Sequence, residues 1–317
     1  MDFEIETYSN VTKAQVQKEL ETIAEEFQSD KPDLTFIVAL NLENAVRRFV
    51  PYETGVEYTA NRGYDIVLGK TIPLLENGHL RFVIILDANI FKDMSPASSL
   101  RRWEVIVHEL CHVRIDLSRF RATGTLVAFT TPHSKMEIAK RNGEILWEEY
   151  AVERSVANWK VTVTAESKFQ YNMAVLFGDA IGFADDVLRD LQSYETILRE
   201  AVIGFRDPET DMTSLTRSVT GTIWDILLRL AKIYANAEVS ANVRSKASEI
   251  ERNSVFIKYF AYCWSRILSL LREYYADHTT SYRLDIIDNI ARAYDDVFQR
   301  SGVHIEDNAS GFSVRMT

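Results

Sequence analysis

Cysteine is scarce in this chain of 317 residues. The 2 cysteines, at positions 111 and 263, are too few for a disulfide framework. A reducing compartment is the simpler environment for such a chain, so we expect a cytoplasmic protein. The first residues lack the basic and apolar regions of a secretory signal peptide. No apolar run approaches the length of a membrane span, so we expect no membrane-embedded segment.

Glycine, proline and positive charge are also in short supply. The chain has 12 Gly and 6 Pro, which favours long helices joined by short connections. Its 36 basic residues are outnumbered by 46 acidic ones, which gives a net charge of −10. This balance argues against a broad surface for nucleic acids or anionic membranes, so we expect no nucleic-acid partner. The 46% hydrophobic content is that of an ordinary globular protein.

Strand signals are confined to the first part of the chain. Apolar and β-branched residues concentrate in segments 34–40, 56–59, 64–69 and 80–87. An Asn-Gly pair at 77–78, before the last of these segments, is typical of a two-residue hairpin turn. We therefore expect a small, mostly antiparallel sheet, with 56–59 or 64–69 at its edge. A helix that runs to about Phe27 should precede it, with Asn10 as its N-cap.

The character of the sequence changes near residue 167. Strand signals nearly vanish, and long amphipathic helical patterns follow, one of which has a possible break near Asn253. The expected fold class is therefore α+β, with a small sheet and then a largely helical C-terminal half. We divide the chain into a first domain at 1–165, a helical bundle at 166–303 and a polar, loosely held tail at 304–317.

The clearest chemical signal is H-E-L-C-H at residues 108–112. Ser95 followed by Pro96 predicts the start of a helix, and the following apolar residues recur with helical spacing. Positions i and i+4 share one face of a helix, so His108 and His112 can direct two imidazoles at one Zn²⁺ ion. Glu109 is placed to act as a general base on a metal-activated water.

A third ligand is needed to complete a catalytic zinc site with one open position. Ser134 begins a capping box, and the helix that it predicts carries Glu148, Glu149 and Glu153. We favour Glu149 as the ligand and keep Glu148 as the alternative. Glu153, at i+4 from Glu149, is a candidate partner for a histidine N–H, or the three acids form a solvated face.

Other residues have less certain roles. His133 and Tyr150 are candidates for stabilising an oxyanion, although either can be structural. Cys111 lies off the face that His108 and His112 share, so packing is the simpler role for it. Asp116, four residues beyond His112, is either a hydrogen-bond partner of a ligand or a surface acid.

These residues resemble the gluzincin group of zinc metallopeptidases, which joins H-E-x-x-H on one helix to a Glu on a later helix. Within that group residues 55–160 are loosely similar to the small peptidases of the ImmA/IrrE kind. Cys111 stands where those proteins usually have Gly. Their Glu-x-x-Ala pattern fits Glu148 with Ala151, whereas Val152 occupies the alanine position if Glu149 is the ligand.

The resemblance implies a zinc metalloendopeptidase that hydrolyses a protein or peptide substrate with Glu109 as the general base. In such enzymes an edge strand of the sheet can pair with an extended peptide. The helical half would then select or admit the substrate. The alternative is a non-catalytic regulatory protein with the same fold, whose helical half binds a protein partner.

Overall fold

A computed structural model describes residues 1–27, 32–49, 67–124, 126, 134–165, 176–205, 212–277, 283–308 and 311–317. Contacts between residues divide the chain into two compact units, Met1–Thr131 and Pro132–Thr317. The expected α+β class is confirmed, because the first unit contains a sheet and the second is largely helical. The expected domain boundary at residue 165 stays a prediction.

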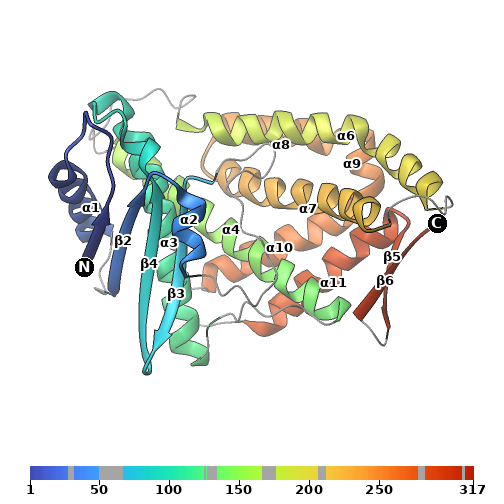
Figure 1. The fold of residues 1–317 in the computed structure, drawn as a ribbon. Coiled ribbons are helices and arrows are strands. Elements are labelled where there is room, and N and C mark those ends of the chain that lie inside the picture. Colours follow the sequence, from blue (N-terminus) through green and yellow to red (C-terminus); the bar gives the residue numbers. More distant parts are fainter. Residues whose placement is uncertain are drawn as a thin grey trace. The chain divides into compact units, whose positions relative to one another are not determined.

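The first unit is built on a mixed four-stranded sheet (Figure 1). Its strands have the order β1-β2-β4-β3, which puts β3 at one end. The pairs β1–β2 and β2–β4 are parallel, so the expected antiparallel pairing is confined to β3–β4. A helix connects β1 to β2, as parallel neighbours require. The strands are β1 Asp2–Ile5, β2 Asp33–Ala39, β3 Gly69–Glu76 and β4 His79–Asp87.

A tight hairpin joins β3 to β4. Asn77 (φ 51°) and Gly78 (φ 80°) both have left-handed backbones, as a type I′ turn requires, so the predicted Asn-Gly turn is confirmed. The strand before the turn begins at Gly69, the last residue of the predicted segment 64–69, and runs to Glu76. Segments 56–59 and 64–66 lie outside the described residues.

Helix α1 (Lys13–Phe27) is capped by Thr12, and the prediction of Asn10 as the cap was wrong. The Thr12 hydroxyl accepts a hydrogen bond from the Gln15 N–H at 3.3 Å, and Gln15 Oε1 accepts one from the Thr12 N–H at 2.9 Å. This reciprocal pair is a capping box, which satisfies two backbone donors at once. The Asn10 amide instead donates to the Lys92 carbonyl.

Helix α3 (Pro96–Thr123) carries the H-E-L-C-H motif and packs on β3 and β4 (Figure 1). It starts at proline, as predicted, and extends over 28 residues. Its end is fixed by Gly124, whose φ of 68° is the left-handed conformation that favours glycine at a helix C-terminus. Ile106 and Leu110 are fully buried, so one face of α3 is held by the core.

A buried ion pair fixes the beginning of α3 against α1. The Glu19 carboxylate accepts hydrogen bonds from Arg102 Nε at 3.1 Å and from Trp103 Nε1 at 2.7 Å. The Arg102 and Glu19 side chains are only 4% and 12% exposed, so water screens their attraction weakly.

Removing Glu19 is expected to destabilise the protein, because it leaves the Arg102 charge buried without its carboxylate. Glu19→Ala should lower the free energy of unfolding by about 3 kcal/mol, measured by urea denaturation. Glu4→Ala is the control, since Glu4 and Arg48 form a pair that is about half exposed. It should cost less than about 1 kcal/mol. Equal losses for the two variants would contradict the prediction.

The second unit is a bundle of helices in which α4 packs against α7 and α11. The predicted break in one long helical pattern is confirmed, since one helix ends at Glu251 and Asn253 caps the next. The helices are α4 Lys135–Ala165, α6 Gly178–Gly204, α7 Met212–Ala237, α8 Ala241–Glu251, α9 Ser254–Tyr259, α10 Ala261–Asp277 and α11 Leu284–Arg300.

The C-terminal residues form a two-stranded hairpin, not the loosely held tail that their polar composition suggested. Strands β5 (Val303–Asn308) and β6 (Gly311–Met316) pair antiparallel, and β5 contacts α11. Val303 is buried, and the Thr317 N–H donates to the Gly302 carbonyl at 2.9 Å. Burial of a single apolar anchor and pairing between strands outweigh the weak local signal.

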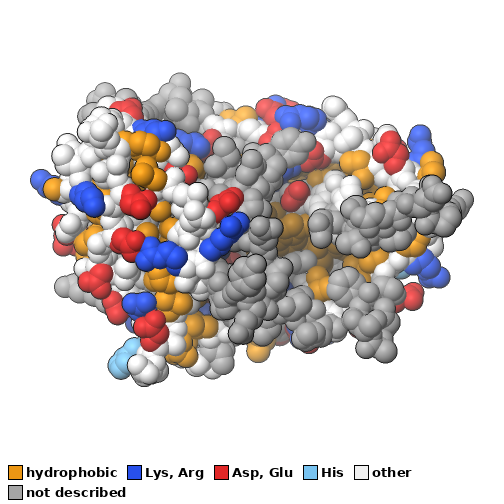
Figure 2. All heavy atoms as spheres, viewed as in Figure 1, with side chains coloured by type: hydrophobic (Ala, Val, Ile, Leu, Met, Phe, Trp, Pro, Cys, Tyr) orange, Lys and Arg blue, Asp and Glu red, His pale blue; other side chains and the backbone are white. Residues whose placement is uncertain are grey.

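Figure 2 shows one face of the molecule. Over the described residues of this face, acidic and basic side chains are interspersed among apolar ones. Two short helical segments, α2 (Leu42–Arg47) and the 3₁₀ turn η2 (Ala88–Phe91), complete the described first unit. Among the described helices, none combines the length and apolar character needed to cross a membrane.

Candidate metal centre

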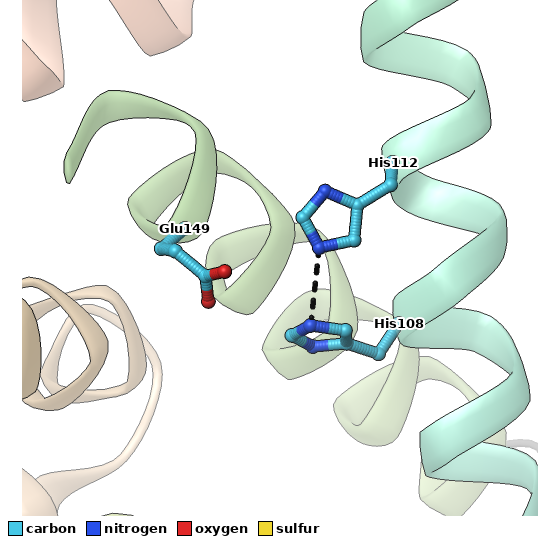
Figure 3. A group of neighbouring side chains, drawn as sticks. All are labelled: His108, His112 and Glu149. Carbon is cyan, nitrogen blue, oxygen red and sulfur yellow. Dashed lines mark hydrogen bonds between the residues drawn. The ribbon is translucent and has the colours of Figure 1, made fainter. Parts of the chain in front are cut away.

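The two motif histidines lie one turn apart on α3 and direct their rings at each other. The Nε2 atoms of His108 and His112 are 3.3 Å apart (Figure 3). Two nitrogens bound to one tetrahedral zinc at about 2.0–2.1 Å would be separated by about 3.4 Å. Both side chains are half-buried. The helix therefore presents the imidazole pair at the spacing that a zinc ion needs.

Glu149, on α4, completes the group. One ligand atom from each of His108, His112 and Glu149 lies within 4.8 Å of the other two. The Glu149 carboxylate is directed toward the imidazole pair (Figure 3). Two imidazole nitrogens and one carboxylate oxygen suit a divalent transition metal, and this donor set is typical of a catalytic zinc site. The residues present therefore fit a divalent metal ion.

The alternative ligand, Glu148, is not part of this group. Among the described residues, His108, His112 and Glu149 form the one group that could hold a metal ion. Glu148 and Glu149 are both half-buried on α4. Adjacent helical residues point in directions about 100° apart, so only one of the two can face a given neighbour. The group that could hold a metal ion thus contains Glu149 and not Glu148, where the sequence left the two acids open.

Glu109 is buried against strand β3. Its carboxylate Oε2 lies 2.8 Å from the Thr71 hydroxyl, which is also 3.0 Å from the Glu109 carbonyl oxygen. Glu109 is 5% exposed and Thr71 6% exposed. A carboxylate in this position has one oxygen oriented by the hydroxyl, and its direction is set by the sheet.

Gly69, two residues before Thr71 on β3, makes room for the same carboxylate. A Cβ atom at this position would lie 2.8 Å from Glu109 Cγ and 2.8 Å from Glu109 Oε1. A contact this short would force the Glu109 side chain to move. Thr71 therefore orients the Glu109 carboxylate through a hydrogen bond. Gly69 leaves room for the same side chain because it has no Cβ atom.

Acidic residues on α4 are held by α7. Lys232 Nζ lies 3.3 Å from Glu149 Oε2, and the Asn236 amide donates to Glu153 Oε2 at 3.2 Å. The spacing of four residues repeats on both helices, so each acid meets one polar side chain. The sequence offered Glu153 as a partner for a histidine N–H, and in the structure Glu153 accepts a hydrogen bond from Asn236.

The other residues singled out in the sequence are buried among structural contacts. Asp116 is buried and forms an ion pair with Arg119 at 2.8 Å, and Cys111 is buried and not part of a disulfide. Tyr150 is 1% exposed and packs edge-on against Tyr275 in the helical unit.

Burial raises the pKa of Tyr150 to about 12, so its hydroxyl stays protonated at neutral pH. Its burial favours the structural role that the sequence left open. His133, the other oxyanion candidate, lies outside the described residues.

Three residues near the candidate centre were not singled out in the sequence: Gly69, Thr71 and Lys232. Gly69 and Thr71 occupy alternate positions of a strand and therefore share one face, but this is visible only once the strand boundaries are known. Lys232 is one of many lysines on amphipathic helices, and no local pattern marks it.

Comparison of the chain with protein-family models, with curated proteins and with solved structures found no match. The assignment therefore rests on the residues themselves, which place two imidazoles and a carboxylate together as a group that could hold a metal ion.

Proposed function

We propose that this protein is a zinc-dependent metallopeptidase of a reducing compartment, with His108, His112 and Glu149 as metal ligands and Glu109 as the general base. The observation that supports this most directly is the approach of the three ligand atoms to within 4.8 Å of one another. Glu109, the neighbour of His108 in sequence, supplies the base that such a site requires.

Each residue has a defined role in this proposal. The two imidazoles provide neutral nitrogen ligands, and Glu149 provides one negative charge. A zinc ion in this group would lower the pKa of a water molecule and polarise the scissile carbonyl. Glu109 accepts the proton of that water and delivers it to the leaving amine. Thr71 holds one oxygen of Glu109, so the side chain need not be ordered anew in each cycle.

The position of β3 suggests how a substrate is held. In the sheet formed by the described residues, β3 is a terminal strand and pairs on one side with β4. An extended peptide can add to such a strand through backbone hydrogen bonds. Thr71 of β3 forms a hydrogen bond with Glu109, and a Cβ atom at Gly69 would meet the same side chain, so a peptide on this strand would pass close to the base. We therefore propose unfolded or extended segments of proteins as substrates.

The ligand assignment is tested by metal analysis of the full-length protein. We expect one zinc per chain, and X-ray absorption at the zinc edge should show two imidazoles and one carboxylate. Glu149→Gln should weaken zinc binding by at least about tenfold, because losing even an indirect partner of a ligand costs that much. Glu148→Gln is the matched control, since it removes the neighbouring acid, and it should bind zinc like the unmodified protein.

Two outcomes would overturn this proposal. If the protein binds no stoichiometric zinc, or if a fourth protein ligand closes the site, the non-catalytic regulatory alternative is favoured. If Glu148→Gln loses zinc and Glu149→Gln does not, the third ligand has been assigned to the wrong acid.

A further inference from the structure

Two polar side chains of α7 meet two acids of α4 in matching order. Lys232 contacts Glu149, and Asn236, one helical turn later, contacts Glu153. Residues four apart lie on one face of a helix, so both contacts arise from the packing of α4 on α7. The helical unit therefore supplies the side chain that faces the proposed third ligand.

The surroundings of Lys232 strengthen this contact. Its side chain is 16% exposed and that of Glu149 is 20% exposed, so water screens their attraction less than at the surface. The Lys232 ammonium also lies 5.7 Å from the centre of the Phe183 ring, and the ring face attracts a cation. Lys232 thus lies close to both the Glu149 carboxylate and the Phe183 ring, and its contact with Glu149 is an ion pair without hydrogen-bond geometry.

We infer that Lys232 is the counter-ion of Glu149 and that it competes with the metal ion for this carboxylate. The inference rests on the proposed function, because it takes Glu149 as a ligand. A divalent cation at the group would be repelled by the nearby ammonium, and Glu149 cannot satisfy both cations equally. Lys232 is therefore a positioning residue that weakens metal binding while it stabilises the metal-free site.

The same contact gives the helical half a role that its sequence does not reveal. Without metal, Glu149 would be a largely buried charge, and such a charge is costly unless it is paired. Lys232 provides the pairing, so the carboxylate stays in place before a metal ion arrives. Metal affinity is thereby set from a second helix and not only by the ligands themselves.

Zinc titration against a competing chelator tests this inference without any peptidase assay. Lys232→Met should bind zinc about tenfold more tightly than the unmodified protein, because the cation that repels the metal ion and competes for Glu149 has been removed. Lys246→Met is the control, because Lys246 forms ion pairs in the same unit with Asp185 and Glu249. Its zinc affinity should be unchanged.

Thermal unfolding provides a second readout. Metal-free Lys232→Met should unfold at a lower temperature than the metal-free parent, because Glu149 has lost its counter-ion. Zinc should raise its unfolding temperature by more than it raises that of the parent, since tighter binding stabilises more. If Lys232→Met does not fold, Lys232→Gln keeps a hydrogen-bond donor without the charge and should show the same tighter binding.

A double-mutant cycle ties the effect to Glu149. In a Glu149→Gln background, Lys232→Met should tighten zinc binding clearly less than in the parent, because only the direct repulsion of the metal ion remains to be removed. Unchanged or weaker zinc binding by Lys232→Met in the parent background would overturn the inference and leave the proposed function standing. If the unmodified protein itself binds no zinc, the proposed function fails and the inference fails with it.

Discussion

Replacing Glu109 by glutamine is expected to lower the rate of peptide hydrolysis about a thousandfold while zinc stays bound. General-base catalysis contributes roughly a hundredfold to ten-thousandfold to such reactions, and an amide cannot accept the proton. The glutamine side chain has the same shape as glutamate. Its carbonyl oxygen can still accept a hydrogen bond from the Thr71 hydroxyl, which lies 2.8 Å from Glu109 Oε2 in the parent. The measurement is cleavage of a fluorogenic peptide library, with zinc content determined on the same samples.

A matched control separates this effect from a general loss of charge. Glu25 is exposed on α1 in the same unit, so Glu25→Gln removes one carboxylate of the same kind without touching the motif helix. It should cleave the library at the parent rate. Undiminished cleavage by zinc-loaded Glu109→Gln would remove Glu109 as the base, and loss of zinc from this variant would show that the residue acts on the metal site instead.

The sequence alone was sufficient to place His108 and His112 together, because their relation is local. Positions four apart on a helix share a face whatever the rest of the chain does, and the proline that begins α3 marks where the helix starts. The acid that lies near these two histidines was harder to choose. Glu148 and Glu149 differ only in the direction in which α4 presents them, and tertiary packing sets the rotation of a helix.

Two local predictions, the N-cap of α1 and the loosely held C-terminal tail, were wrong because another feature of the same segment outweighed the one that the prediction used. Asn10 is a strong capping residue, yet Thr12 forms the cap because Gln15 lies three residues later and completes a capping box. The C-terminal residues are polar on average, yet pairing between strands and the burial of Val303 hold them as a hairpin. Average composition does not reveal a single buried anchor.

The parallel part of the sheet could not be predicted for a further reason. Strands β1, β2 and β4 are parallel neighbours, and each pairing joins segments separated by a helix or more of sequence. The hairpin between β3 and β4 needs only a two-residue turn, which the pair Asn77 and Gly78 predicts. Pairing between strands that are close in sequence can therefore be predicted from local residues, whereas pairing between distant strands depends on tertiary packing.

A substitution at Gly69 should have the second-largest effect on hydrolysis, although this residue would touch neither the metal nor its ligands. Gly69→Ala puts a methyl group 2.8 Å from Glu109 Cγ and Oε1, so the carboxylate must move away from strand β3. Displacing a catalytic group by about 1 Å typically costs about a hundredfold in rate. The φ angle of Gly69 is not positive, so alanine fits the backbone and the effect arises from the contact alone.

The test compares the catalytic efficiency and zinc content of Gly69→Ala with those of Gly182→Ala. At Gly182, in α6, an added methyl group meets nothing within 4 Å, so this control changes the same atoms in open space. We expect a loss of about a hundredfold for Gly69→Ala with unchanged zinc, and no loss for the control. In a Glu109→Gln background, Gly69→Ala should cost little more, because the base that it displaces is already inactive. Full activity of Gly69→Ala would show that the position of Glu109 against β3 is not the catalytic one.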